Sequence, residues 1–89
     1  MIWKISLARE AEKFLEKNRL SQEEIFDLIR KTIKKFQGEN INIDIKKLKG
    51  PWLGFYRIRK GNFRIVAEFN FENFSVLVEQ IDQRGKMYR

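Results

Sequence analysis

The sequence predicts an α+β fold in which a helical hairpin packs on a largely antiparallel four-stranded sheet, in the order β-α-α-β-β-β. An alternating apolar segment begins the chain, two segments with helical periodicity follow, and three short β-like segments occupy the second half. No repeat, linker or low-complexity stretch interrupts the 89 residues. Residues 1–89 are therefore expected to form a single domain.

The N-terminal half is predicted to form one strand and two helices. Residues 2–7 alternate between apolar and polar, which is the period of a half-buried strand, and residues 8–18 change to helical spacing. A second helix is expected to begin after Ser21, which precedes Glu24 by three residues in a capping-box arrangement, and to stop at Gly38. The apolar face of this helix comprises Ile25, Leu28, Ile29, Ile33 and Phe36.

Three further strands are predicted over residues 53–59, 63–69 and 74–81. The first two are joined by the tripeptide Lys60-Gly61-Asn62, because Gly and Asn accept positive φ at little cost. Residues 70–73 are expected to form the next turn. The lysines of the segment Lys46-Lys47-Leu48-Lys49, taken alone, are interpreted as part of a solvated loop.

The composition excludes several kinds of chemistry, because the chain has neither cysteine nor histidine. Without cysteine there is no disulfide scaffold, thiolate zinc site or cysteine nucleophile. Without histidine the commonest general base near pH 7 and most transition-metal sites are excluded. No apolar run approaches the roughly 18 residues of a membrane span, and the N-terminus does not resemble a signal peptide. We expect a cytoplasmic protein that needs no metal or other cofactor and does not bind membranes.

The net charge of +7 is concentrated in residues 46–64, which contain seven basic side chains and no acidic one. Strand alternation places Arg57 and Arg59 on one face, and Arg64 of the next strand is expected to join them within reach of a single anion. The pattern favours binding of a phosphate or a nucleic acid. The alternative is a basic sheet face that only keeps the protein soluble.

A second basic cluster ends the chain, with Arg84, Lys86 and Tyr88 among its members. If the last strand anchors this segment at the rim of the sheet, Arg84 joins the other arginines and Tyr88 lies over them. Aromatic rings beside guanidinium groups are typical of sites that bind single-stranded RNA. The alternative is a frayed basic tail.

Three motifs resemble the RelE/ParE superfamily of toxins from toxin-antitoxin systems. They are Lys47-Leu48-Lys49-Gly50, Tyr56-Arg57-Ile58-Arg59-Lys60-Gly61-Asn62-Phe63-Arg64-Ile65-Val66 and Gln83-Arg84-Gly85-Lys86-Met87-Tyr88. The middle motif is the most specific of the three, and the likeness extends over essentially the whole chain, including the predicted order of elements.

The resemblance implies a toxin that a cognate antitoxin holds inactive. On release, a RelE-type toxin enters the ribosomal A site and cleaves the mRNA there. A ribose 2′-OH attacks the adjacent phosphate and leaves a 2′,3′-cyclic phosphate, without a metal. Carried over by position, the implied catalytic residues are Arg57, Arg59, Arg64, Arg84 and Tyr88. The lysines expected to bind RNA beside them are Lys46, Lys47, Lys49, Lys60 and Lys86.

Two questions stay open at this point. Some RelE members carry lysine where this chain has Arg57 and Arg59, and arginine does not give up a proton, so the general acid and base are not assigned. Lys60 and Lys86 are candidates for proton donation and Tyr88 for abstraction. ParE-type relatives, which inhibit DNA gyrase by binding it, and a non-catalytic homologue are the alternative functions.

The antitoxin is expected to contact exposed apolar positions through an amphipathic helix. Trp3, Trp52 and Phe55 are candidates for that contact, and their alternative role is ordinary core or rim packing.

Overall fold

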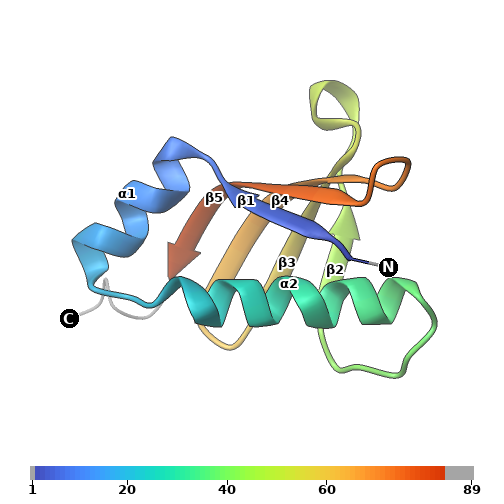
Figure 1. Cartoon of the computed structure of the whole chain (residues 1–89), viewed down its shortest axis with the longest axis horizontal. Coiled ribbons are helices and arrows are strands. Elements are labelled where there is room, and N and C mark those ends of the chain that lie inside the picture. Colours follow the sequence, from blue (N-terminus) through green and yellow to red (C-terminus); the bar gives the residue numbers. More distant parts are fainter. Residues whose placement is uncertain (1, 84–89) are drawn as a thin grey trace.

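The computed structural model describes residues 2–83, which form two helices and a five-stranded sheet (Figure 1). The predicted site residues Arg84, Lys86 and Tyr88 lie outside the described residues. The elements in chain order are β1 (Lys4–Leu7), α1 (Arg9–Asn18), α2 (Gln22–Phe36), β2 (Asp44–Lys47), the 3₁₀ turn η1 (Gly50–Trp52), β3 (Phe55–Lys60), β4 (Phe63–Asn70) and β5 (Ser75–Gln83).

The sheet has the strand order β1-β5-β4-β3-β2. The first strand pairs with the last in parallel, and every other neighbouring pair is antiparallel. Figure 1 shows α2 crossing the strands and α1 lying beside the end of β5. The predicted α+β class and the helical hairpin are confirmed, and no helix within residues 2–83 is long and apolar enough to cross a membrane.

The predicted strand count was wrong by one, because Lys46 and Lys47 belong to the edge strand β2 and not to a loop. This strand pairs with β3, with Ile45 opposite Ile58. Three of its four residues are charged, so its sequence carries almost no apolar alternation. Short charged strands are common at sheet edges, where charge discourages pairing with other chains. The charged residues that obscure the strand pattern in the sequence are therefore the residues expected at a sheet edge.

The core lies between the helices and one face of the sheet. Ile58 and Ile65 are fully buried at its centre and oppose each other across β3 and β4. Tyr56 packs its ring against Phe36 of α2, with ring centroids 5.1 Å apart, so the predicted inward face of β3 is confirmed. The buried hydroxyl of Thr32 donates to the Leu28 carbonyl at 2.9 Å and is therefore satisfied.

The hairpin between β3 and β4 fixes which residues oppose each other. Lys60 pairs with Phe63, so Gly61 and Asn62 form a two-residue turn, and Gly61 supplies a positive φ of 59°. The next turn falls one residue later than predicted, over residues 71–74. Asn70 organises it, because its side-chain oxygen accepts from the backbone N–H groups of Glu72 and Asn73.

Ser21 caps α2 as predicted, and its hydroxyl accepts from the backbone N–H of Glu23 at 3.1 Å. Replacing Ser21 by alanine leaves that N–H without its acceptor, so we expect the free energy of unfolding to fall by about 1 kcal/mol. Urea denaturation measures the change. The control is Ser6→Ala in β1, an exposed serine for which we expect a change within about 0.5 kcal/mol. Equal losses for both variants would contradict the capping role.

Candidate nucleic-acid interface

Three arginines lie on the side of the sheet that faces away from the helices. Arg59 of β3 stands directly opposite Arg64 of β4, and Arg57 lies two residues from Arg59 along the same strand. Directly opposed residues have Cβ atoms about 5 Å apart, and alternate residues of a strand share a face. The predicted convergence of Arg57, Arg59 and Arg64 on one side is therefore observed.

Lys46 extends this group, because it stands opposite Arg57 across the β2–β3 pair. We call the surface formed by Lys46, Arg57, Arg59 and Arg64 the arginine face. Its members come from β2, β3 and β4, so the register of three strands positions them. Four cations on neighbouring positions of one sheet face can contact consecutive phosphates of a single strand.

The other predicted lysines take different places. Lys47 stands opposite Tyr56, on the helix side of the sheet, where its side chain is exposed at the edge. Lys49 is exposed just before the η1 turn. Lys60 directs its ammonium group to the carbonyl of Asn42 at 3.3 Å. The structure therefore brings Lys46 into the arginine face and keeps Lys47 and Lys60 off it.

Two carboxylates that sequence reasoning missed lie against the arginine face. Asp82 of β5 stands opposite Arg64, and its Oδ2 accepts from the Arg64 Nη2 at 3.0 Å. Asp44 of β2 stands opposite Arg59. Both aspartates lie outside residues 46–64, so a count of charges along the chain separates them from the arginines. The Arg64–Asp82 side chains are 37% and 51% exposed, and such a pair contributes at most about 1 kcal/mol.

Arg57 has unsatisfied hydrogen-bonding capacity. Its Nε atom is buried and has no acceptor among residues 2–83. A buried donor without a partner is unfavourable by about 1–3 kcal/mol. A phosphate oxygen reaching the arginine face is an acceptor of the kind that a guanidinium group binds most strongly.

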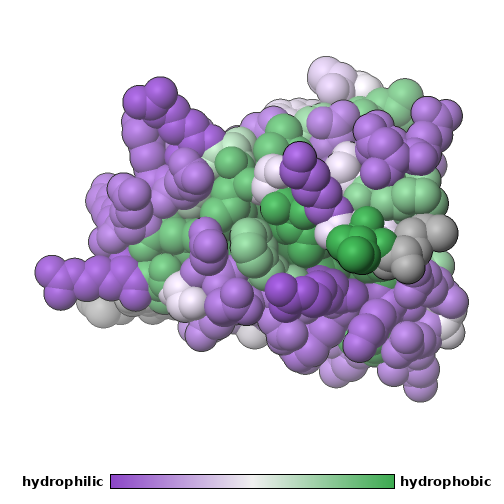
Figure 2. Space-filling model, viewed as in Figure 1, coloured by the Kyte–Doolittle hydropathy of each residue, from purple (hydrophilic) through white to green (hydrophobic). Residues whose placement is uncertain are grey.

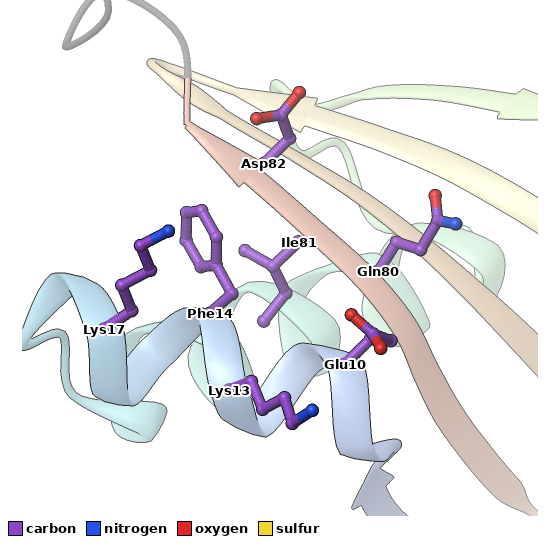
Figure 3. A pocket seen from close by; sticks show the side chains of 7 residues that line it. All are labelled: Glu10, Lys13, Phe14, Lys17, Gln80, Ile81 and Asp82. Carbon is purple, nitrogen blue, oxygen red and sulfur yellow. The ribbon is translucent and has the colours of Figure 1, made fainter.

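A groove of about 570 Å³ runs beside the arginine face, between α1 and the end of β5 (Figure 3). Asp82 lines it and also pairs with Arg64, so the groove and the arginine face meet at this residue. In Figure 3, Lys17 and Phe14 point from α1 toward the end of β5 that carries Asp82. The other lining residues are Glu10, Lys13, Gln80 and Ile81.

The helix side of the molecule, within residues 2–83, carries an apolar strip and a groove in place of a cluster of arginines. Figure 2 shows mostly hydrophilic side chains there, with an apolar strip between β1 and α2. A second groove of about 370 Å³ lies at that strip, and Trp3 is among its lining residues. The Trp3 ring makes edge contacts with Phe71 and Phe74 at 5.7 and 5.5 Å. Trp3 thus packs against its neighbours in the described structure, and its contact with an antitoxin stays a prediction.

Solved structures of toxins have the same fold as this chain. In the RelB–RelE antitoxin–toxin complex from Methanococcus jannaschii the match has 27% sequence identity and a TM-score of 0.58, covering 92% of this chain and 93% of the other. The archaeal RelE–RelB complex from Pyrococcus horikoshii matches with 21% sequence identity and a TM-score of 0.64, over 97% of this chain and 99% of the other. The RelBE2 toxin–antitoxin complex from Mycobacterium tuberculosis matches with 18% sequence identity and a TM-score of 0.61, over 92% of this chain and 91% of the other.

No protein-family model matches the chain, and no curated protein matches it at a significant level. The fold and the arginine face define a small α+β protein with one basic sheet surface. The structural neighbours make the class more specific, since the chain has the fold of the RelE-like toxin superfamily. The resemblance that its sequence motifs indicate is confirmed at this level.

Proposed function

We propose that the chain is the toxin of a type II toxin-antitoxin system, and that its arginine face cleaves mRNA in the ribosomal A site. The observation that carries the proposal is the convergence of Arg57, Arg59 and Arg64 on one side of the sheet. The presence of RelE toxins in complex with their antitoxins among the structural neighbours supports a cognate antitoxin as partner. The proposed site of action is the cytoplasm, where the ribosomes are.

The proposed reaction is an attack by a ribose 2′-OH on the adjacent phosphate. The O2′–P bond forms, the P–O5′ bond breaks, and the products are a 2′,3′-cyclic phosphate and a free 5′-OH. Negative charge builds up on the phosphate oxygens in the transition state, and preorganised guanidinium groups stabilise it. The proton of the 2′-OH is removed by a base and the leaving oxygen receives a proton.

Each residue has a proposed role in this reaction. Arg64 and Arg84 hold the scissile phosphate, and Arg57 and Arg59 bind the RNA backbone and stabilise charge. Tyr88 positions or polarises the 2′-OH. Lys86 is the proposed proton donor, because Lys60 lies on the helix side of the sheet with its ammonium group 3.3 Å from the Asn42 carbonyl. Lys46, Lys47 and Lys49 bind RNA outside the reacting centre.

The experiment that tests the function is induction of the protein in cells followed by mapping of mRNA 5′ ends. New ends within codons, and their suppression by a coexpressed cognate antitoxin, are expected. A supercoiling assay on the same cells covers the gyrase alternative. Unchanged mRNA ends together with altered supercoiling would contradict the proposal and favour a ParE-type toxin. Binding of RNA that weakens with salt, but without cleavage even on ribosomes, would indicate a non-catalytic homologue.

Asp82 is expected to compete with RNA for Arg64, because its Oδ2 forms an ion pair with the Arg64 Nη2 at 3.0 Å. Replacing Asp82 by asparagine removes the negative charge and releases Arg64. We expect RNA binding at low salt to tighten by about two- to fivefold, with the difference fading at high salt as screening increases. Fluorescence anisotropy with a labelled single-stranded RNA measures it.

The matched control for Asp82 is Asp27→Asn on α2. Asp27 is 59% exposed and pairs with Lys31 at 3.3 Å, so its removal makes the same change in net charge within a similar ion pair. If both variants tighten RNA binding equally, the effect belongs to the total charge and the local competition is refuted.

A further inference from the structure

An aromatic pair, the exposed Trp52 and the half-buried Phe55, lies at one end of the arginine face. Trp52 ends the η1 turn and is 43% exposed, and Phe55 begins β3. Their ring centroids are 5.1 Å apart at an interplanar angle of 87°, so the edge of one ring meets the face of the other. Leu53, between them in the chain, is 71% exposed.

The pair is continuous with the arginines. Phe55, Arg57 and Arg59 are alternate residues of β3 and therefore share one side of the sheet. A strand rises about 3.3 Å per residue, so Phe55 lies about 7 Å from Arg57 and about 13 Å from Arg59 along the strand. These spacings are of the size of one or two nucleotides of an extended RNA strand.

Backbone hydrogen bonds hold the segment that carries Trp52. The N–H groups of Trp52 and Leu53 donate to the carbonyls of Lys49 and Gly50 at 3.2 and 3.1 Å. Leu48 donates to the Phe55 carbonyl at 3.0 Å, and this bond closes the loop at its base. The Trp52 ring is therefore presented on a fixed turn, which lowers the entropy lost when a ligand stacks on it.

Packing does not account for this aromatic surface. Within residues 2–83, neither Trp52 nor Phe55 belongs to the buried core or to the half-buried side chains packed against it. The charges nearby are mostly positive, with Lys46, Lys49 and Arg57 in the flanking segments. Glu68 stands opposite Phe55 and offers an acceptor to the exocyclic amine of a base. A cationic strand with an exposed aromatic ring is the arrangement that binds single-stranded nucleic acid.

We propose that Trp52 is a stacking site for an unpaired RNA base, one or two nucleotides from the phosphate that the arginine face holds. The inference rests on the proposed function and extends it with a second binding site. Phe55 packs against the indole at an angle of 87°, and the exposed Trp52 ring takes the base. A helical protein partner fits this patch poorly, because helix recognition uses apolar anchors over two turns and only Trp52, Leu53 and Phe55 are clustered here.

The test measures binding of short single-stranded RNAs to the full chain by fluorescence anisotropy at low salt. A parallel set of RNAs carries an abasic nucleotide at each position in turn. Trp52→Ala is expected to weaken binding about tenfold or more, and Trp52→Phe is expected to retain most of the affinity. One abasic position is expected to weaken wild-type binding by a similar factor and to have no further effect on Trp52→Ala.

Leu53→Ala is the matched control, because Leu53 is an exposed apolar neighbour in the same turn that has no aromatic face. We expect it to bind RNA like the wild type. Wild-type affinity in Trp52→Ala would overturn the stacking site and leave the proposed function standing. Equal losses of RNA affinity in Trp52→Ala and Leu53→Ala would also overturn it, because they would show that the shape of the turn and not the indole ring supports binding. A wild-type chain that binds none of the short RNAs would overturn the stacking site, whereas the mapping of mRNA 5′ ends in cells decides the proposed function separately.

Discussion

Replacement of Arg64 by alanine is expected to lower the rate of mRNA cleavage by about a hundredfold or more, with the fold retained. Arg64 is the member of the arginine face that β4 contributes, and it stands opposite Arg59 on one side and Asp82 on the other. A guanidinium at that place stabilises the phosphate in the transition state, and alanine removes both its charge and its donors. Because the ion pair with Asp82 is exposed, its loss costs less than about 1 kcal/mol of stability.

The measurement is primer extension on mRNA after incubation with programmed ribosomes and the purified variant. Arg30→Ala is the matched control, because Arg30 is exposed on α2, on the helix side of the sheet, and its removal changes the net charge equally. Arg64→Lys is expected to fall between wild type and alanine, since lysine keeps the charge but cannot bind a phosphate through two parallel hydrogen bonds. Cleavage by Arg64→Ala at the wild-type rate would refute the assigned role.

The convergence of the arginines on one side of the sheet was predictable from the sequence, because it depends only on alternation within a strand and on the length of one turn. Alternation along β3 places Arg57 and Arg59 on one side, and a two-residue turn at Gly61-Asn62 leaves little freedom in the register of β4. Arg64 must then fall opposite Arg59. The buried partners Ile58 and Ile65 enforce the same register, because a slip of one residue would turn the arginines into the core.

The carboxylates beside the arginines were not predictable by the same reasoning. Asp44 stands opposite Arg59 only because β2 forms, and that strand has a single apolar residue, Ile45, to reveal it. Asp82 reaches Arg64 because β5 lies next to β4. The parallel pairing of β1 with β5 likewise joins the two ends of the chain and depends on the order of strands in the sheet. Such contacts are non-local, and periodicity within a segment does not encode them.

The same core that sets the register is expected to supply much of the stability. Replacing Ile58 by alanine should lower the free energy of unfolding by about 2–5 kcal/mol, because it removes three buried carbon atoms and leaves a cavity. Ile58 is fully buried and is flanked in the sheet by Ile45 on β2 and Ile65 on β4, so the loss falls where three strands meet. Urea denaturation followed by circular dichroism measures the change.

Ile2→Ala is the control for Ile58→Ala, since it deletes the same atoms from a residue that is 90% exposed, and we expect a change within about 0.5 kcal/mol. A loss below about 1 kcal/mol in Ile58→Ala would show that the strands repack around the cavity. Ile58 lies between Arg57 and Arg59 in the chain, so its side chain anchors the backbone from which both guanidinium groups project. We therefore expect RNA affinity to fall in Ile58→Ala even where the protein remains folded, whereas Ile2→Ala should bind RNA like the wild type.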